Sequence, residues 1–192
     1  MTKPVRRAIL LFLLPGMVLS SLGAADPITR AFKPGGRVEM KLEAGEYEIL
    51  PGAGDSISIS MSGARTDQVR VRLDGTGASA RLAITDTPRH DFRAVIRVPE
   101  HCDLVVRHSA GDLRIGAIRG NKDLRTRAGN VEVMVGDTKD YRSVFASVTA
   151  GDLEAKPFQT SKGGLFNSFR WTGPGKYELK AKLMAGDLSF TN

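Results

Sequence analysis

The sequence predicts an all-β protein, and three observations support this. Apolar and polar residues alternate along most of the chain, which is the pattern of strands with one buried face. Glycine accounts for 21 of the 192 residues while aromatic residues make up only 6%, a composition that favours many tight turns over a few long helices. A short Ala-Gly-Asp motif also recurs, as described below. After the N-terminal segment, no long window has the spacing of an amphipathic helix.

Residues 1–25 have the layout of a secretory signal peptide. Three basic residues precede an apolar run over residues 8–22, and small residues follow at 23–25. Cleavage after Ala25 or after Gly23 fits this layout. The run is short for a membrane span and is broken by Pro15-Gly16. We therefore expect a secreted or periplasmic, cell-envelope protein without a transmembrane segment in its mature chain; a retained N-terminal anchor and twin-arginine export through Arg6-Arg7 are the alternatives.

The predicted mature chain, residues 26–192, reads as one domain with uneven charge. Removing the signal removes three basic residues and no acidic ones, which leaves 25 basic against 21 acidic residues. The excess lies in residues 65–127, which hold thirteen basic and eight acidic residues. An apolar content of 41% argues against wholesale disorder. Cys102 is the single cysteine, so the sequence excludes an internal disulfide and any multi-cysteine metal site.

Alternating segments predict the strands in chain order. The clearest are 37–42, 56–61 and 68–73. Further candidates run through Leu82 and Ile84, 92–98, Leu104 and Val106, Leu113 and Ile115, 131–135, 144–148, 177–183, and 188–190. Each places its apolar residues on one face, so each needs a partner surface that covers that face.

A six-residue motif of the type Ala-Gly-Asp-Leu-x-Ile recurs along the chain. Copies begin at Ala110, Ala128, Ala150 and Ala185, with looser copies at Ala44 and Ala53. Glycine permits a backbone corner between strands, and the following Asp or Asn holds the turn. The predicted corner residues are Gly45, Gly54, Gly111, Asp112, Gly129, Asn130, Gly151, Asp152, Gly186 and Asp187. Intervals near 20 residues predict stacked units, in which Asp112, Asn130 and Asp152 form a ladder.

The stretches 98–113 and 124–131, with the closing Ala-Gly-Asp-Leu of 185–188, resemble the bacterial putative-adhesin repeat family of secreted or envelope proteins. The resemblance covers about residues 37–190. It implies a right-handed β-solenoid or β-helix-like stack of short strands, and it supplies no catalytic residues. The segment between Gly151 and Gly186 departs from the even spacing. It is either a unit without the motif or a capping loop.

The sequence points to no catalytic, cofactor or metal site. His101, Cys102 and Asp103, with His108, form the one cluster of reactive side chains, and adjacent strand residues face opposite ways. The expected role of Cys102 is a buried free thiol at a strand start. The turn aspartates are expected to cap turns, with calcium binding as the alternative. We therefore expect a non-enzymatic structural or adhesin-like interaction module; the alternative is a carbohydrate-active β-helix enzyme acting on polysaccharide.

Arginines alternate with apolar residues in the middle of the chain. Period-two geometry sends them outward, to form a face on Arg70, Arg72, Arg97, Arg107, Arg114 and Arg125. Guanidinium groups bind carboxylates and phosphates in pairs of hydrogen bonds, so the expected partners are anionic polysaccharide, the envelope surface or another protein. Nucleic acid is not expected, since no aromatic stacking platform accompanies the arginines. The alternative is a solvated face paired with Asp67, Asp74, Asp103 and Asp123.

Overall fold

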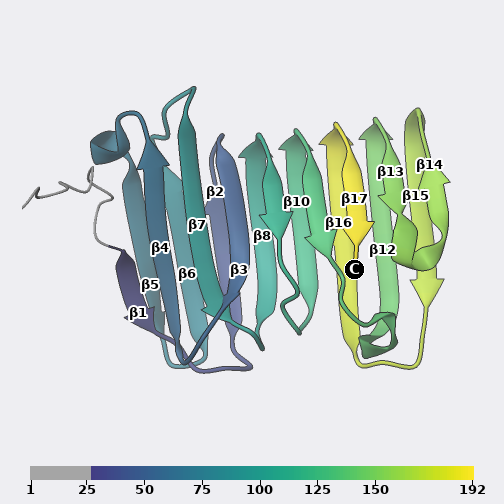
Figure 1. The fold of residues 1–192 in the computed structure, drawn as a ribbon, viewed down its shortest axis with the longest axis horizontal. Coiled ribbons are helices and arrows are strands. Elements are labelled where there is room, and N and C mark those ends of the chain that lie inside the picture. Colours follow the sequence, from purple (N-terminus) through teal and green to yellow (C-terminus); the bar gives the residue numbers. More distant parts are fainter. Residues whose placement is uncertain (1–26) are drawn as a thin grey trace, which may run out of the picture.

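A computed structural model describes residues 27–192 as two stacked β-sheets with a shared core (Figure 1). The predicted signal peptide lies outside these residues. Three short 3-10 turns, η1 (Thr66–Gln68), η2 (Thr138–Asp140) and η3 (Lys156–Phe158), interrupt the strands. No helix in the described part has the length and apolar character needed to cross a bilayer. The all-β prediction is confirmed.

One sheet has nine strands and the other has eight, and neither closes on itself. The nine-stranded sheet contains, in spatial order, β1 (Ile28–Ala31), β4 (Ser56–Gly63), β7 (Phe92–Pro99), β3 (Glu46–Gly52), β9 (Leu113–Ile115), β11 (Val131–Met134), β17 (Leu188–Thr191), β13 (Leu153–Ala155) and β14 (Thr160–Lys162). The eight-stranded sheet contains β15 (Leu165–Thr172), β12 (Tyr141–Ala150), β16 (Tyr177–Ala185), β10 (Lys122–Ala128), β8 (Asp103–Ala110), β2 (Arg37–Leu42), β6 (Ser79–Thr85) and β5 (Arg70–Thr76).

The alternation read from the sequence divides each strand between core and solvent. In β2, Val38, Met40 and Leu42 are buried. Arg37 and Lys41 face outward on the same strand. The inward side chains of both sheets form one continuous apolar cluster between them. Outward charges therefore lie on the two flat faces of the molecule, and their arrangement is set by strand register.

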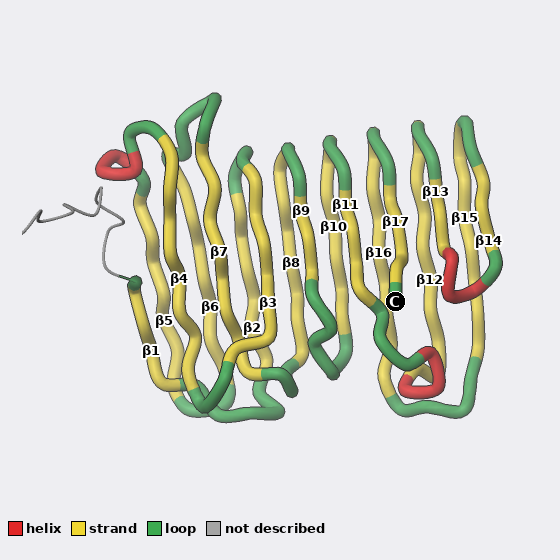
Figure 2. The backbone as a smooth tube through the Cα atoms, in the orientation of Figure 1, coloured by secondary structure: helices red, strands yellow, loops and turns green. Residues whose placement is uncertain are grey.

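Five units have the same build: a strand of the eight-stranded sheet, a corner at the motif, then a strand of the nine-stranded sheet. They are β2–β3, β8–β9, β10–β11, β16–β17 and β12–β13. Their corners form a row along one edge of the molecule, at the top of Figure 2. Backbone hydrogen bonds link each corner to the next: Gly45 N–H donates to the Ala110 carbonyl at 2.9 Å, and Gly111 N–H to that of Ala128 at 3.0 Å.

The corner glycines approach their neighbours too closely for any side chain. Gly129 has φ +118°, and a Cβ there would lie 2.0 Å from the carbonyl oxygen of Gly111. Gly111, Gly151 and Gly186 have the same kind of conformation, with the corresponding distances between 2.1 and 2.2 Å. Gly54 lies apart from this row, in the turn between β3 and β4, and a Cβ there would meet nothing within 4 Å.

The units do not stack in chain order throughout. β8–β9 and β10–β11 are neighbours, but the C-terminal unit β16–β17 then lies between β10–β11 and β12–β13 (Figure 1). Asp187 consequently separates Asn130 from Asp152 in the row of corners. Units that are consecutive in the chain are therefore neighbours only in the middle of the stack, because the chain after β11 passes over one position that β16–β17 fills.

Antiparallel strands close both ends of the stack, whereas the middle pairs are parallel. β1, β4 and β7 pair antiparallel at one end, as do β5 and β6. At the other end β14 pairs antiparallel with β13, and β15 with β12. The irregular segment after Gly151 is therefore a terminal unit without the motif. Phe158 anchors it to the core, with its ring 5.0 Å from Trp171 and 6.3 Å from Phe190.

We expect Gly129→Ala to lower the free energy of unfolding by about 3 kcal/mol or more. A Cβ would collide with rigid backbone, in addition to the cost of about 1–3 kcal/mol of a disfavoured φ. Gly54→Ala, with φ +88° and open space, isolates the second effect and should cost about 1–2 kcal/mol. Urea denaturation measures both. Equal losses for the two variants would show that close packing of the corners does not limit stability.

Candidate cationic face

The structure distributes the six predicted arginines over both faces of the molecule. Arg70 and Arg72 lie on β5, Arg107 on β8 and Arg125 on β10, all in the eight-stranded sheet. Arg97 on β7 and Arg114 on β9 belong to the nine-stranded sheet. Chain periodicity gives the inward or outward direction of each residue but not the sheet that holds it, so the predicted set falls into a group of four and a group of two.

Strand register aligns four basic side chains on adjacent strands of the eight-stranded sheet. Lys182 on β16 is paired with Arg125 on β10, Arg125 with Arg107 on β8, and Arg107 with Lys41 on β2. We call Lys41, Arg107, Arg125 and Lys182 the cationic row. Adjacent strands are about 4.8 Å apart, so the row extends across roughly 14 Å. The two lysines are absent from the predicted face because that prediction rests on segments in which arginines alternate with apolar residues.

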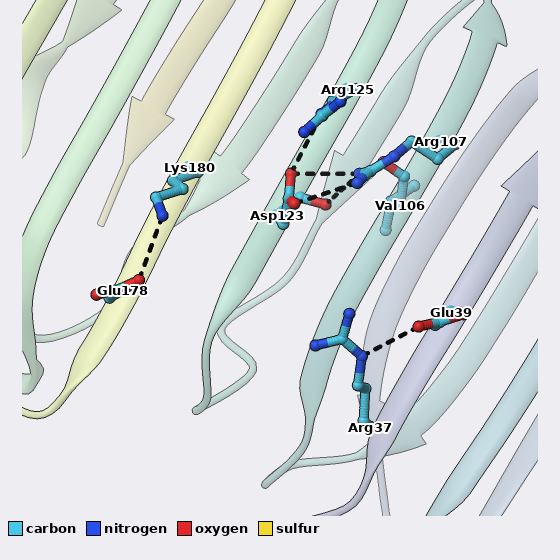
Figure 3. Close-up of polar contacts among 8 residues, drawn as sticks. All are labelled: Arg37, Glu39, Val106, Arg107, Asp123, Arg125, Glu178 and Lys180. Atoms are coloured by element: carbon cyan, nitrogen blue, oxygen red, sulfur yellow. Dashed lines mark hydrogen bonds and ion pairs between the residues drawn. The ribbon is translucent and has the colours of Figure 1, made fainter.

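Asp123 organises the centre of the row (Figure 3). Both of its carboxylate oxygens accept from the Arg107 guanidinium, at 3.2 and 3.1 Å, and Arg125 Nε lies 3.7 Å away. The guanidinium of Arg107 also donates to the carbonyls of Val106 and Asp123. In contrast, no carboxylate within residues 27–192 lies within 4.0 Å of the Lys41 or Lys182 ammonium group. One carboxylate therefore orients two arginines and leaves the row positive.

A groove of about 590 Å³ continues from the row toward β5. The small side chains of Ala83 and Val105 are among those that line it. Its walls carry Arg37, Lys41, Arg72, Arg81 and Arg107 against the carboxylates of Glu39 and Asp74. Glu39 is 3.2 Å from Arg37 and 3.6 Å from Arg81, and Asp74 is 3.7 Å from Arg72. Both carboxylates thus serve as counter-ions within a groove that has a basic excess.

The two outer faces differ in charge. Strands of the eight-stranded sheet carry twelve basic and five acidic side chains that are not buried, whereas those of the nine-stranded sheet carry five and four. The twelve are Arg37, Lys41, Arg70, Arg72, Arg81, Arg107, Arg125, Arg127, Arg142, Arg170, Lys180 and Lys182; the five are Glu39, Asp74, Asp103, Asp123 and Glu178. The basic excess of the described strands is therefore concentrated on one face.

Only some of the four aspartates predicted to pair with the arginines do so. Asp74 and Asp123 contact arginines, and Arg70 pairs with Asp86 at 3.1 Å instead. Asp103 accepts from the side chain and backbone of Asn121. Asp67 forms no ion pair within the described chain. All of these pairs are substantially solvent-exposed, and exposed pairs contribute little stability.

The turn residues make local contacts along the row of corners. Asn130 Nδ2 donates to Asp112 Oδ1 at 3.0 Å, and the backbone N–H of Asp152 donates to Asp187 Oδ1 at 3.1 Å. Residues 27–192 contain no group of three or more His, Cys, Asp or Glu side chains that could hold a metal ion. Both contacts join neighbouring corners, which are 18 and 35 residues apart in the chain.

The Cys102 cluster does not converge on a site. Cys102 is buried directly before β8, while His101 is exposed. Burial raises the pKa of the thiol to about 12, and the Lys122 charge opposes this shift only in part. A thiol with this pKa stays protonated and is a poor nucleophile at neutral pH. His108 points into the core beside the ring of Tyr47, at 5.3 Å, and burial lowers its pKa.

Lys122 is a buried cation that the sequence analysis did not identify. Its side chain is 2% exposed, and its ammonium group donates to the Ile118 carbonyl and, at 2.7 Å, to the Tyr141 hydroxyl. No carboxylate in the described chain lies within 4.0 Å of it. Desolvation lowers its pKa to about 8, and the negative charges of Asp103 and Asp140 oppose this shift only in part. Lys122 occupies an inward position of β10, where the alternation predicts an apolar residue. This mismatch is the sequence signal for a buried cation.

Comparisons with known proteins agree with the fold. No family model matches the sequence, and no curated protein is similar to it. Among solved structures, the chain resembles one described as a putative cell adhesion protein from Clostridium sporogenes, with a TM-score of 0.54 and 10% identity, covering 86% of this chain and 98% of that one. A putative adhesin from Bacteroides fragilis is also 10% identical and covers 86% of this chain and 97% of its own, with a TM-score of 0.26. The first likeness shows a shared fold.

The buried lysine gives a specific pH dependence. Between about pH 8 and 10.5 the native state binds fewer protons at Lys122 than the unfolded state, so this residue makes stability rise with pH. Comparison with Lys122→Met isolates the effect, since Cys102 acts in the opposite direction in both proteins. From pH 7.5 to 9.5, unmodified protein should gain about 2 kcal/mol relative to the variant in urea denaturation. A constant difference would show that Lys122 titrates normally.

Proposed function

We propose that this protein is a non-enzymatic, adhesin-like interaction module of the cell envelope, and that its eight-stranded sheet binds a carboxylate- or phosphate-bearing partner. The observation that carries the proposal is the cationic row. Four basic side chains occupy one register level on four adjacent strands without an intervening acid. Such a row presents positive charge at a regular interval to an extended anionic partner.

The form of the surface supports binding rather than turnover. The groove beside the row holds its two carboxylates against arginines, which is an arrangement of counter-ions and not of a free acid–base pair. The charges of this face come from strands rather than loops. Polar groups fixed on rigid elements lose little conformational freedom on binding.

Export and architecture belong to the same proposal. The signal-like layout of residues 1–25 supports a secreted or periplasmic location. The sequential neighbours β8–β9 and β10–β11, with their repeated corners, support a relationship to the β-solenoid stacks of adhesin-like repeats. An exported protein with one basic face meets anionic polymers and anionic surfaces in the envelope, and both carry the chemistry that arginine and lysine recognise.

We expect Lys41→Ala/Lys182→Ala to weaken binding to polygalacturonate, used as a carboxylate polymer, by roughly tenfold or more at low ionic strength. Neither lysine has a carboxylate partner, so the change leaves no acid unpaired. Binding by the unmodified protein should also fall steeply as salt is added. Isothermal titration calorimetry at several salt concentrations measures both effects.

The matched control is Arg97→Ala/Arg114→Ala, which removes the same charge from the nine-stranded sheet. Its affinity should stay within about twofold of the unmodified protein, because screening weakens charges on the opposite face. Equal losses in both double variants would mean that net charge, and not the cationic row, governs binding. If neither variant nor unmodified protein binds the polymer or anionic vesicles, the proposed function is wrong.

A further inference from the structure

Three of the exposed large apolar side chains lie at one corner of the eight-stranded sheet, with Phe166 and Met184 on its outer face and Leu165 at the end of β15. Leu165 is 69% exposed, Phe166 80% and Met184 61%. By register, Phe166 on β15 and Met184 on β16 lie level with Thr149 on the intervening strand β12. We call Leu165, Phe166 and Met184 the apolar tip. Scattered exposed apolar residues are ordinary, but a group of this kind marks an interaction surface.

The tip is surrounded by basic side chains. Arg127 on β10 lies level with Met184, and Lys182 of the cationic row is two residues before Met184 on β16. Arg170 and Lys182 lie over the ring of Phe145, at 5.2 and 5.9 Å, on the same outer face. Apolar and basic groups thus form one continuous surface over β15, β12, β16 and β10.

The conformation of Phe166 shows that the fold does not require this residue. Its φ is +55°, in the left-handed region that disfavours bulky side chains and that asparagine tolerates much better. Its side chain packs against nothing in the core that would compensate for the strain. A strained and exposed aromatic residue therefore points to a contact outside the chain.

We propose that the cationic row and the apolar tip together dock this protein onto an anionic lipid bilayer. This inference rests on the proposed function and specifies its partner. Basic side chains near a bilayer are attracted to anionic headgroups, and apolar side chains enter the boundary between headgroups and acyl chains. Phe166, Met184 and Leu165 insert at one corner, while Lys182, Arg125 and Arg107 lie over the headgroups.

Two other occupants fit the surface less well. A second copy docked tip to tip would bring Arg127 and Lys182 of both copies together without acids to pair with them. An anionic polysaccharide would satisfy the row, but it offers no apolar medium for Leu165 and Met184, which have no polar group or ring to stack on a sugar. A bilayer offers anionic headgroups to the basic side chains and an apolar medium to the apolar side chains.

The test compares Phe166→Asn/Met184→Ser with the unmodified protein on vesicles of equal parts phosphatidylglycerol and phosphatidylcholine. Asparagine suits the backbone at 166, so the variant should fold. We expect its vesicle affinity in a sedimentation assay to fall roughly tenfold or more, while its affinity for polygalacturonate is unchanged. The control is Met134→Ser, which removes a 40% exposed apolar residue from the nine-stranded sheet and should change neither.

Insertion is read directly from Phe166→Trp. The chain has a single tryptophan, Trp171, which faces the core, so the unmodified protein gives the background. On vesicles with brominated acyl chains, we expect the fluorescence of the variant to be quenched and that of the unmodified protein to change little. Binding without quenching would overturn the insertion of the tip.

The outcomes separate the two proposals. If Lys41→Ala/Lys182→Ala loses vesicles and polymer while Phe166→Asn/Met184→Ser keeps both, the cationic face stands and the bilayer inference is wrong. Binding to polygalacturonate but not to anionic vesicles overturns it in favour of a polysaccharide. A dimer seen in analytical ultracentrifugation without lipid, and abolished by Phe166→Asn/Met184→Ser, overturns it in favour of a second copy. Full vesicle binding by Lys41→Ala/Lys182→Ala contradicts the proposed function itself.

Discussion

The stack of units depends on how closely the backbone of one corner approaches the backbone of the next. Four of the five corner glycines lie so near the carbonyl of the adjacent corner that a single methyl group would overlap it; they are Gly111, Gly129, Gly151 and Gly186. This closeness lets amide groups at successive corners hydrogen-bond, so the turns continue the sheets rather than ending them. Strand register follows from it, because every unit leaves its corner at the same level. The cationic row exists because residues at equal distances from equivalent corners are brought side by side.

The interior tolerates one charge because hydrogen bonds replace its hydration. The Lys122 ammonium donates to a backbone carbonyl and a tyrosine hydroxyl, and no carboxylate of residues 27–192 lies within 4.0 Å of it. Apolar burial elsewhere in the core offsets this unfavourable desolvation. At the surface the desolvation penalty is absent. Exposed charges on the eight-stranded sheet therefore change stability little and remain available to a partner. Lysine is thus part of the core in one place and an exposed charge in another.

The properties that could be predicted from the sequence are those that a short segment determines by itself. Alternation in β2, β7 and β8 predicts both the strands and their buried faces, since period two is a local property. Strand order is not local: nothing in residues 177–191 indicates that they lie beside β10 rather than after β13. For the same reason Arg97 and Arg114 were grouped with arginines of the other sheet, and Lys41 and Lys182 were left out. Phe166 and Met184 are 18 residues apart in the sequence, and only the pairing of β15 and β16 with β12 brings them to the same register level.

The position of β16–β17 has a consequence for how the molecule is assembled. This unit pairs on one side with β10–β11 and on the other with β12–β13, so it joins two blocks that otherwise do not contact through strand pairing. During synthesis, residues 27–172 emerge before the unit that joins the two blocks of each sheet. Cooperative folding must wait for residues 177–191, and pairing between such distant segments is slow. The fold is thus completed by its C-terminal strands rather than built up in chain order.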